Sequence, residues 1–333
     1  MAVRVAVVGG GLMGLRHARV LRGFPGVELV AVVDRAEVAR QRVASELGVT
    51  APAGLDDLWT CQPDAVVVAL PDDAHVEAAL AVLERGLPVL VEKPLATSVD
   101  DAVRIWRAAR GTLLMVGHLL RFDARYLRAR RLVASGELGD VLHVYARRNS
   151  AAGAGQRYGG STRLMWHVSI HDIDLVRWVT GRQIVAVTAR GVSRGVAGQG
   201  QLDSLVALLE LDGGGVAGLE SCWALPGIYR DGIDARLEVV GTRGALEVQG
   251  LEQGLAVVVG DARWHPDTTR YVEHDDGAGG GILAAELAHF VRCVTLGVPC
   301  VIDPGDALAA VRVAAAIEAA VETGLRIPVG EEV

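Results

Sequence analysis

The amino-acid sequence predicts an α/β domain with a doubly wound parallel sheet, followed by an α+β domain with a largely antiparallel sheet. The first is indicated by an apolar strand that runs into a G-x-G-x-x-G turn, and by alternating strands and helices up to about residue 120. The second is indicated by successive strand segments separated by glycine turns. We expect residues 1–120 to form the first domain and residues 121–333 the second, with the C-terminal helix free to pack back on the first.

The composition excludes several classes of protein. The 333 residues are 51% hydrophobic, which is sufficient for two cores. The net charge is -7 and no Lys/Arg-rich run occurs, so nucleic acid is not an expected partner. No run of about 18 apolar residues is present, and we expect no membrane contact and a cytoplasmic protein. The four cysteines form no C-x-x-C pattern, are expected as free thiols, and are assigned no chemistry: Cys61, Cys222, Cys293 and Cys300.

The glycine turn has the spacing of a dinucleotide-binding loop. The strand at residues 3–8 is followed by Gly9, Gly11 and Gly14 and then by a helical pattern. The first glycine permits a tight turn, the second lets backbone N–H groups approach a pyrophosphate, and the third lets helix and strand pack closely. The positive end of the helix dipole would then face the phosphates. Two further residues of this loop are assigned to the cofactor site: Leu12 and Met13.

An acidic residue follows the second strand at the distance expected for ribose recognition. Asp34 ends the apolar run 29–33 and lies twenty residues after Gly14, where a carboxylate can accept both ribose hydroxyls of an adenosine. Its charge would repel a 2′-phosphate, so NAD is favoured. Arg35 leaves NADP possible as the cofactor, because a guanidinium can pair with that phosphate. The alternative is a glycine loop that only closes an ordinary βαβ unit.

The remaining first-domain elements follow from periodicity and from capping signals. Helices are predicted at residues 36–47, 54–59, 73–85 and 98–110, and strands at 65–70, 88–91 and 112–116. Ligands of a parallel sheet bind at the carboxyl ends of its strands. Four residues that are able to contact a ligand follow strands directly: Pro71, Asp72, Glu92 and Lys93.

Beyond about Arg121 the pattern changes. Helices are predicted at residues 123–134, 282–296 and 306–323, and strands at 141–146, 184–189, 204–211, 215–221, 237–240, 245–248 and 255–259. The glycine-rich stretch 275–281 lacks the Lys-Ser/Thr of a phosphate loop and is predicted to be a mobile loop.

Lys93 is the first candidate for acid–base chemistry. It follows an apolar strand at the ligand-binding edge, between Glu92 and a proline. Desolvation beside an oxidised nicotinamide would lower the preference of its ammonium for the charged form. The alternative is a surface lysine paired with Glu92.

The second candidate is the segment 166–178. On a helix, His167, His171, Asp174 and Trp178 would share one face, and such a buried polar stripe would suit a substrate hydroxyl. A helical histidine pair can also bind zinc, but Val168 stands where the usual glutamate base would be, and we predict no metal. The third interpretation is that the histidines have a structural role and form hydrogen bonds with carboxylates.

An arginine-rich stretch adjoins these histidines. No Asp or Glu occurs from residue 141 through residue 171, whereas Arg147, Arg148, Arg157 and Arg163 are present. Such a stretch could hold a carboxylate or phosphate group of a substrate, through Arg148 and Arg163 in particular. Solvated arginines or an oligomer contact are the alternative.

Five segments in this order resemble the Gfo/Idh/MocA family of oxidoreductases: GGGLMG, AVVDR, PDDAH through VEKPLA, VGHLLRFD and IHDIDLVRW. The resemblance covers essentially the whole chain. It implies a Rossmann domain and a second domain with a largely antiparallel sheet, in a homodimer or homotetramer. It also implies interconversion of an alcohol and a ketone on a sugar, inositol or related polyol, with NAD or NADP as cofactor.

The resemblance also implies roles for individual residues. Lys93 would be the active-site lysine, and His171 the histidine that acts on the reacting hydroxyl. The dinucleotide would be held by Gly9, Gly11, Gly14 and Asp34, with four more residues near its ribose or nicotinamide: Leu70, Pro71, His75 and Glu92.

His167 is a departure from the family pattern. In inositol dehydrogenase-like members an aspartate lies one helical turn before the histidine, and here that position is His167. The VGH and RF segments look closer to a subgroup that includes nucleotide-sugar dehydrogenases, for which the arginines would suit an anionic substrate. Two alternatives stay open, a dinucleotide-binding regulator without turnover and a reductase of an imine or enone.

Overall fold

A computed structural model describes most of the chain, at residues 2–158, 162–198, 200–227, 233–250, 257–259, 262–264, 267–272 and 279–330. The chain divides into two compact units. The first comprises Met1–Phe122 and Thr268–Leu308, and the second comprises Asp123–Asp267 and Ala309–Val333. The segment 268–308 therefore belongs to the first unit, although the sequence suggested the second domain for it.

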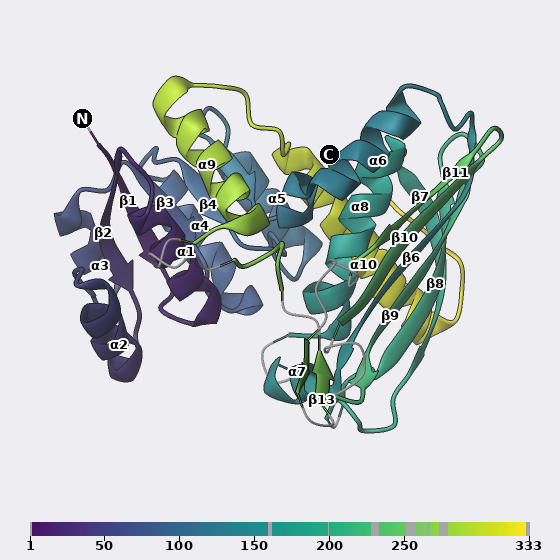
Figure 1. The fold of residues 1–333 in the computed structure, drawn as a ribbon, viewed down its shortest axis with the longest axis horizontal. Coiled ribbons are helices and arrows are strands. Elements are labelled where there is room, and N and C mark those ends of the chain that lie inside the picture. Colours follow the sequence, from purple (N-terminus) through teal and green to yellow (C-terminus); the bar gives the residue numbers. More distant parts are fainter. Residues whose placement is uncertain are drawn as a thin grey trace. The chain divides into compact units, whose positions relative to one another are not determined.

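The first unit contains a five-stranded parallel sheet in the order β2-β1-β3-β4-β5 (Figure 1). Its strands are β1 (Val3–Val8), β2 (Val27–Val33), β3 (Ala65–Val68), β4 (Val89–Val91) and β5 (Leu114–Val116). The strand order reverses between β1 and β3, and ligands of such sheets bind at the carboxyl ends near this point. The glycine turn follows β1 there.

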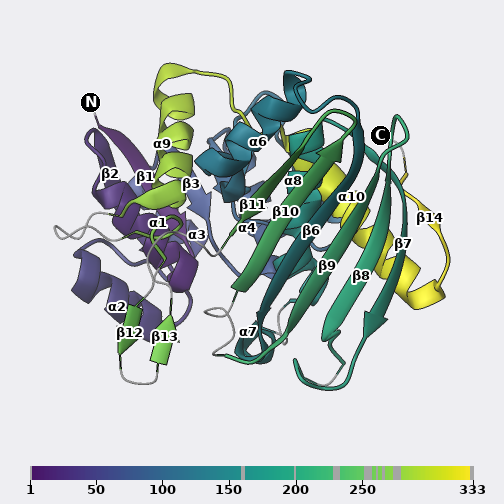
Figure 2. The same cartoon turned by 45° about the vertical axis from the view of Figure 1, so that its right-hand side comes forward.

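The helices of the first unit are α1 (Leu12–Arg22), α2 (Glu37–Leu47), α3 (Leu55–Leu58), α4 (His75–Leu83), α5 (Val99–Ala108) and α9 (Gly281–Leu296), with short 3-10 turns at Trp59–Cys61, Asp72–Ala74 and Leu119–Phe122. The Oγ of Ser98 caps α5 by accepting a hydrogen bond from the backbone N–H of Asp101. Helix α9 lies beside α1 (Figure 2), and Leu283, Leu287 and Phe290 enter the same buried core as β1.

The second unit contains a seven-stranded sheet in the order β11-β10-β6-β9-β8-β7-β14. Its strands are β6 (Val141–Ala151), β7 (Ile184–Val192), β8 (Ser204–Leu211), β9 (Val216–Leu225), β10 (Ile233–Gly241), β11 (Ala245–Gln249) and β14 (Ile327–Pro328). Only β6 and β9 pair in parallel among these neighbours. A separate hairpin joins β12 (Val257–Val259) and β13 (Ala262–Trp264). The parallel sheet and the mostly antiparallel sheet confirm the predicted fold class.

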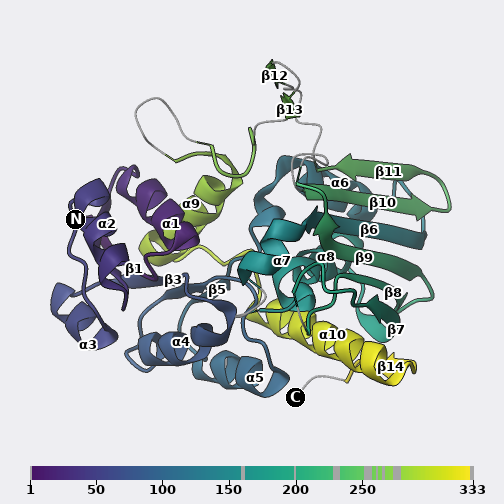
Figure 3. The ribbon, with the colours of Figure 1, turned by 90° about the horizontal axis from the view of Figure 1, so that it is seen from below.

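Helices cover one face of the seven-stranded sheet (Figure 3). They are α6 (Ala124–Ala134), α7 (Ala152–Tyr158), α8 (Ile170–Thr180) and α10 (Pro304–Thr323), which enters this unit at Ala309. The other face exposes apolar side chains: Val206 is 57% exposed, Leu208 49% and Val216 39%. Among the described residues, no helix is both long and apolar enough to cross a membrane.

One local prediction needs correction. Residues 166–178 do not form a single α-helix, because Met165–Ser169 is a π-helical turn and α8 begins only at Ile170. The π turn is wider than an α turn, and the shared face of His167 and His171 stays a prediction. The predicted loop at residues 275–281 lies largely outside the described residues.

Candidate active site

The three glycines of the turn have different structural roles. Gly9 has φ +112°, and a Cβ there would lie 2.3 Å from the carbonyl oxygen of Ala69. A Cβ on Gly14 would lie 1.7 Å from the carbonyl oxygen of Gly9, so only glycine lets α1 pack against the turn. Gly11, by contrast, is exposed, and a Cβ there meets no protein atom within 4 Å. The fold itself does not require this glycine, whereas close approach of a pyrophosphate does.

The carboxylate of Asp34 is oriented by backbone groups at the end of β2. Its Oδ2 accepts a hydrogen bond from Gly10 N at 2.8 Å, and its Oδ1 accepts one from Ala36 N at 2.8 Å. Each oxygen retains a lone pair for a ribose hydroxyl. Arg35 and Leu12 are exposed and Met13 is half-buried. The loop therefore has the donor and acceptor set that an adenosine diphosphate needs.

Glu92 is the buried centre of the first unit's polar groups. Its Oε1 lies 2.7 Å from His17 Nε2, and its Oε2 accepts a hydrogen bond from the backbone N–H of Lys93 at 3.2 Å. Burial alone would raise the pKa of Glu92, but the hydrogen bond from His17 and the nearby positive charges outweigh it, so the pKa is lowered. An ionised carboxylate is therefore held at the backbone of Lys93, whose side chain is half-buried at the carboxyl end of β4.

His75 links two segments that follow strands. Its ring is fully buried, with Nδ1 at 2.7 Å from the carbonyl oxygen of Pro94 and Nε2 at 3.0 Å from that of Leu70. A neutral imidazole donates to one of these oxygens, and an imidazolium donates to both. In either form the ring holds two carbonyl groups, that of Leu70, just before Pro71, and that of Pro94, just after Lys93. His75 thus supports this edge of the sheet from within the core.

Sequence reasoning missed a second buried carboxyl in this unit. Glu286 on α9 has no exposed surface, and neither carboxylate oxygen has a hydrogen-bond partner in the described structure. Burial and the charge of Glu92 raise its pKa well above the usual value, so the folded state favours its neutral form. The same two causes raise the pKa of Tyr271 to about 12, and the guanidinium of Arg16 lies 4.0 Å from the centre of that ring. An acidic residue on the apolar stripe of α9 is the signal that could have indicated Glu286.

The second unit carries both predicted histidines at the start of α8. His167 lies in the π-helical turn and His171 in the first turn of α8, and both are half-buried. The ring centre of His167 is 6.3 Å from that of Trp223 on β9. Single π-turns within helices occur frequently at functional sites. Asp174 and Trp178, also predicted on this face, are buried.

A buried ion pair fixes the helix that carries His171. Arg148 on β6 contacts both carboxylate oxygens of Asp172, and both residues are less than 10% exposed. Burial raises the pKa of Asp172 and Arg148 offsets part of this effect, while Asp172 raises the pKa of Arg148. The bidentate geometry indicates an ionised pair. Tyr126 on α6 contacts Arg148 as well, and burial raises the pKa of its hydroxyl.

The other arginines of this stretch contact carboxylates of the same unit. Arg147 lies 3.1 Å from an oxygen of Asp234, and the exposed Arg163 lies 3.1 Å from one of Glu318. Burial raises the pKa of Glu318 to about 7, although Arg163 acts in the opposite direction. Arg148 and Arg163 both contact carboxylates of the same unit, and their role in holding an anionic substrate stays a prediction. Asp172, Asp234 and Glu318 all lie outside the acid-free stretch from which the role was inferred.

Comparison with known proteins identifies the family. A profile described as the oxidoreductase family with NAD-binding Rossmann fold matches residues 3–118, and one for the GFO/IDH/MocA C-terminal domain matches residues 126–247. The chain belongs to the GFO/IDH/MocA family. The resemblance inferred from the sequence is thereby confirmed, as is the prediction of a dehydrogenase of CH–OH groups with an NAD-binding Rossmann domain.

Individual GFO/IDH/MocA relatives are similar over nearly their whole length. An inositol 2-dehydrogenase of Mycolicibacterium gilvum is 32% identical, over 98% of this chain and 93% of the relative. A scyllo-inositol 2-dehydrogenase (NAD(+)) of Bacillus subtilis is 28% identical, over 92% and 90%. Among solved structures, GenD2 from gentamicin A biosynthesis in complex with NAD has a TM-score of 0.85 and 29% identity, covering 99% of this chain and 97% of GenD2.

Proposed function

We propose that this enzyme oxidises a secondary hydroxyl of inositol, or of a closely related neutral cyclic polyol, to a ketone. The observation that carries the proposal is the similarity to inositol 2-dehydrogenases, which extends across both units at 32% identity. NAD, when bound, supplies the hydride acceptor at C4 of its nicotinamide. The chain's own residues must then orient the substrate and remove the hydroxyl proton.

We assign the proton chemistry to Lys93 and His171. Lys93 is the only lysine of the 333 residues, since every other member of the Lys and Arg set is arginine. Arginine stays protonated in proteins and cannot act as a base, whereas a lysine amine can. The ionised Glu92 holds the Lys93 backbone, and the Arg148–Asp172 pair holds the helix next to His171. Both groups are thus mounted on rigid, buried supports.

His167 is proposed as a substrate contact beside His171. The family resemblance implies an aspartate at this position, which would accept a hydrogen bond from a hydroxyl group. A neutral imidazole accepts one hydrogen bond and donates another, so it still suits a polyol hydroxyl. The ring is half-buried, and Trp223 lies beside it.

A neutral substrate is favoured over an anionic one. Arg147, Arg148 and Arg163 each lie at 3.2 Å or less from a carboxylate oxygen of the second unit. A substrate phosphate would have to displace these partners, and for the buried Arg148 that displacement would leave Asp172 unpaired. NAD is favoured over NADP for a related reason, since the oriented carboxylate of Asp34 would repel a 2′-phosphate.

The exposed sheet face is the proposed contact between copies of the chain. Family resemblance implies a homodimer or homotetramer, and Val206, Leu208 and Val216 form an exposed apolar group on adjacent strands. Burial of such a group against a second copy is the usual reason for large apolar side chains to gather on one face.

The proposal is tested by NADH formation with myo-inositol, scyllo-inositol, sugar acids and nucleotide sugars as substrates. We expect turnover with an inositol and NAD, and kcat lower by roughly 100-fold or more in Lys93→Ala and His171→Ala while NADH binding is retained. Turnover restricted to nucleotide sugars, or full activity in both variants, would contradict the assignment.

The single lysine offers a direct measurement. Protein labelled with ¹³C only in lysine gives one side-chain Cε signal, which belongs to Lys93. We expect this signal to shift when an inositol is added to the NADH complex. His171→Ala serves as the matched control for substrate binding, and a signal that does not respond in the wild type would exclude contact between Lys93 and the polyol.

A further inference from the structure

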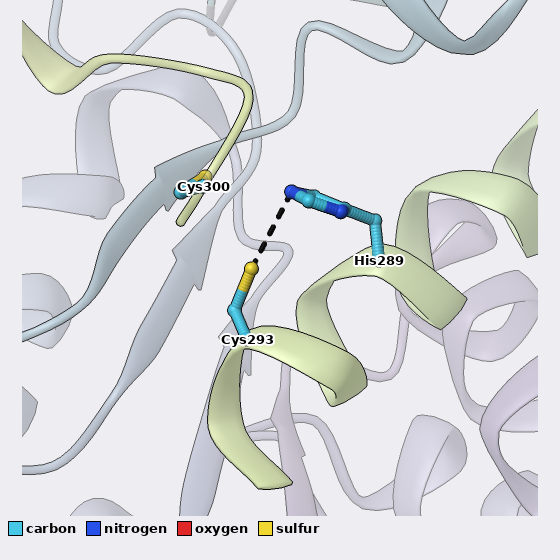
Figure 4. A group of neighbouring side chains, drawn as sticks. All are labelled: His289, Cys293 and Cys300. Atoms are coloured by element: carbon cyan, nitrogen blue, oxygen red, sulfur yellow. Dashed lines mark hydrogen bonds between the residues drawn. The ribbon is translucent and has the colours of Figure 1, made fainter. Parts of the chain in front are cut away.

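A cluster of three metal-ligating side chains lies in the first unit, apart from the residues assigned to the active site. A ring nitrogen of His289, Sγ of Cys293 and Sγ of Cys300 all lie within 4.8 Å of one another (Figure 4). His289 and Cys293 are four residues apart on α9 and so share one face of the helix. Cys300 comes from the segment that follows the helix. Cys293 is buried and the other two residues are half-buried.

Hydrogen bonds define the protonation of this cluster. The backbone N–H of Val301 donates to Nε2 of His289 at 3.0 Å, which places the ring proton on Nδ1. Sγ of Cys293 lies 3.4 Å from the same nitrogen, so its S–H is the donor in that contact. A neutral imidazole with its lone pair beside two thiols is a suitable ligand set for a soft or borderline cation.

We propose that His289, Cys293 and Cys300 form a zinc site, with water as the fourth ligand. In a tetrahedral site with these ligands, neighbouring ligand atoms are roughly 3.5–3.8 Å apart, as follows from the usual Zn–S and Zn–N distances. The Cys293–His289 distance is already 3.4 Å, and no other pair exceeds 4.8 Å. Side-chain movements of about 1 Å would therefore complete the geometry.

Zinc binding at this site is an exchange of the ion for protons, and it needs no oxidant or reductant. Zn²⁺ takes the place of the two thiol protons, two Zn–S bonds form, and two protons leave to solvent. Nε2 exchanges the hydrogen bond from Val301 for a bond to the ion. Val301 is 54% exposed, so water can satisfy its N–H group.

The ion would connect the end of α9 to the segment after it. Phe290 on α9 and Ile302 in that segment are both fully buried in the core of the first unit. Phe122 packs against the ring of His289, with ring centres 5.6 Å apart. A bond from this segment to α9 would stabilise the folded state, because zinc binds the folded arrangement of the three ligands.

Cobalt(II) uptake by the reduced, chelator-treated full chain tests the proposal. We expect one cobalt ion per chain, with thiolate-to-cobalt charge-transfer absorption and the intense visible bands of a tetrahedral site. Zinc should displace the cobalt and release no further protons, whereas zinc added to the metal-free protein should release two protons per ion. Thermal unfolding should shift to higher temperature with zinc.

Variants separate this site from other thiols. Cys293→Ser, Cys300→Ser and His289→Asn should each weaken cobalt binding about 100-fold, as loss of a direct ligand is at least as costly as loss of an outer-shell partner. Cys61→Ser and Cys222→Ser are the matched controls and should bind cobalt like the wild type. Absence of the charge-transfer band in the wild type, or an unchanged cobalt affinity and band intensity in Cys300→Ser, would overturn the proposal.

Discussion

The guanidinium of Arg148 donates two hydrogen bonds to the carboxylate of Asp172, from Nε at 2.8 Å and from Nη2 at 3.0 Å. Asp172 directly follows His171, so this pair ties strand β6 to the first turn of α8 beside the proposed catalytic imidazole. Removal of one partner leaves an unpaired charge in the protein interior. The pair is therefore expected to matter for both stability and catalysis.

Asp172→Asn should lower the free energy of unfolding by about 3–5 kcal/mol, because the buried guanidinium of Arg148 loses its counter-charge. We also expect kcat to fall while the affinity for NADH is unchanged, since the glycine loop lies in the other unit. Urea unfolding and stopped-flow kinetics measure the two effects. Glu210→Gln is the matched control, because Arg326 contacts Glu210 with the same bidentate geometry at 2.7 Å, but on the surface. Equal losses in the two variants would refute this account.

Gly14→Ala and Gly11→Ala should have opposite consequences. The added Cβ at Gly14 would overlap the carbonyl oxygen of Gly9, so we expect a stability loss of about 3 kcal/mol or more. At Gly11 the Cβ meets no protein atom within 4 Å, so stability should change by less than about 1 kcal/mol. NADH affinity of Gly11→Ala should nevertheless fall roughly tenfold or more, because the methyl group would overlap the pyrophosphate. Fluorescence titration measures this, and unchanged affinity would exclude pyrophosphate binding at Gly11.

Glu286→Gln should become more stable than the wild type as the pH rises. Since the folded state raises the pKa of Glu286, folding favours its protonated form, and the associated stability is complete only below the usual pKa of a glutamate. That stability declines as the pH rises toward the folded-state pKa. The amide of glutamine does not titrate. The free energies of unfolding of the two proteins should therefore differ least near pH 4, where a carboxyl group of ordinary pKa titrates, and should differ increasingly at higher pH. Urea unfolding across this pH range is the measurement, and a difference independent of pH would contradict the assignment.

Charges on the exposed sheet face should separate the proposed oligomer. Val206→Lys combined with Leu208→Lys places two ammonium groups on the apolar face of β8, which a second copy could bury only at high cost. We expect light scattering to report the mass of a monomer for this variant. Leu296→Lys is the control, since Leu296 is 68% exposed but lies at the end of α9 in the first unit. A variant that retains the wild-type mass would exclude this face as the interface.

The sequence was sufficient for features that depend on local pattern. β8 spans Ser204–Leu211, as predicted, because a short, mostly apolar run ends there at the glycine turn signal of residues 213–215. The parallel sheet could also be predicted, since βαβ units allow few arrangements. The π-helical turn could not, because the spacing of His167 and His171 fits a regular α-helix equally well and packing decides between the two.

Long-range pairing accounts for most of what the sequence did not reveal at the candidate site. Arg147 meets Asp234 at a separation of 87 residues, and Arg148 meets Asp172 at 24. The arginine-rich stretch therefore looked like a cationic site, although its carboxylate partners lie elsewhere in the sequence. Glu286 differs from these ion pairs, because its position between Leu283 and Phe290 on an apolar helix stripe can be seen in the sequence. The roles of Lys93 and His171 remain predictions.

The discontinuity of the first unit has a consequence for biosynthesis. Its core needs Leu287, Phe290 and Ile302, which the ribosome adds only after the whole segment Asp123–Asp267. The nascent N-terminal strands therefore emerge with part of their apolar surface uncovered, and they keep it until most of the chain has been translated. Such a polypeptide depends on chaperone protection for longer than one whose N-terminal domain is contiguous, and a fragment that stops at Phe122 should aggregate when expressed alone.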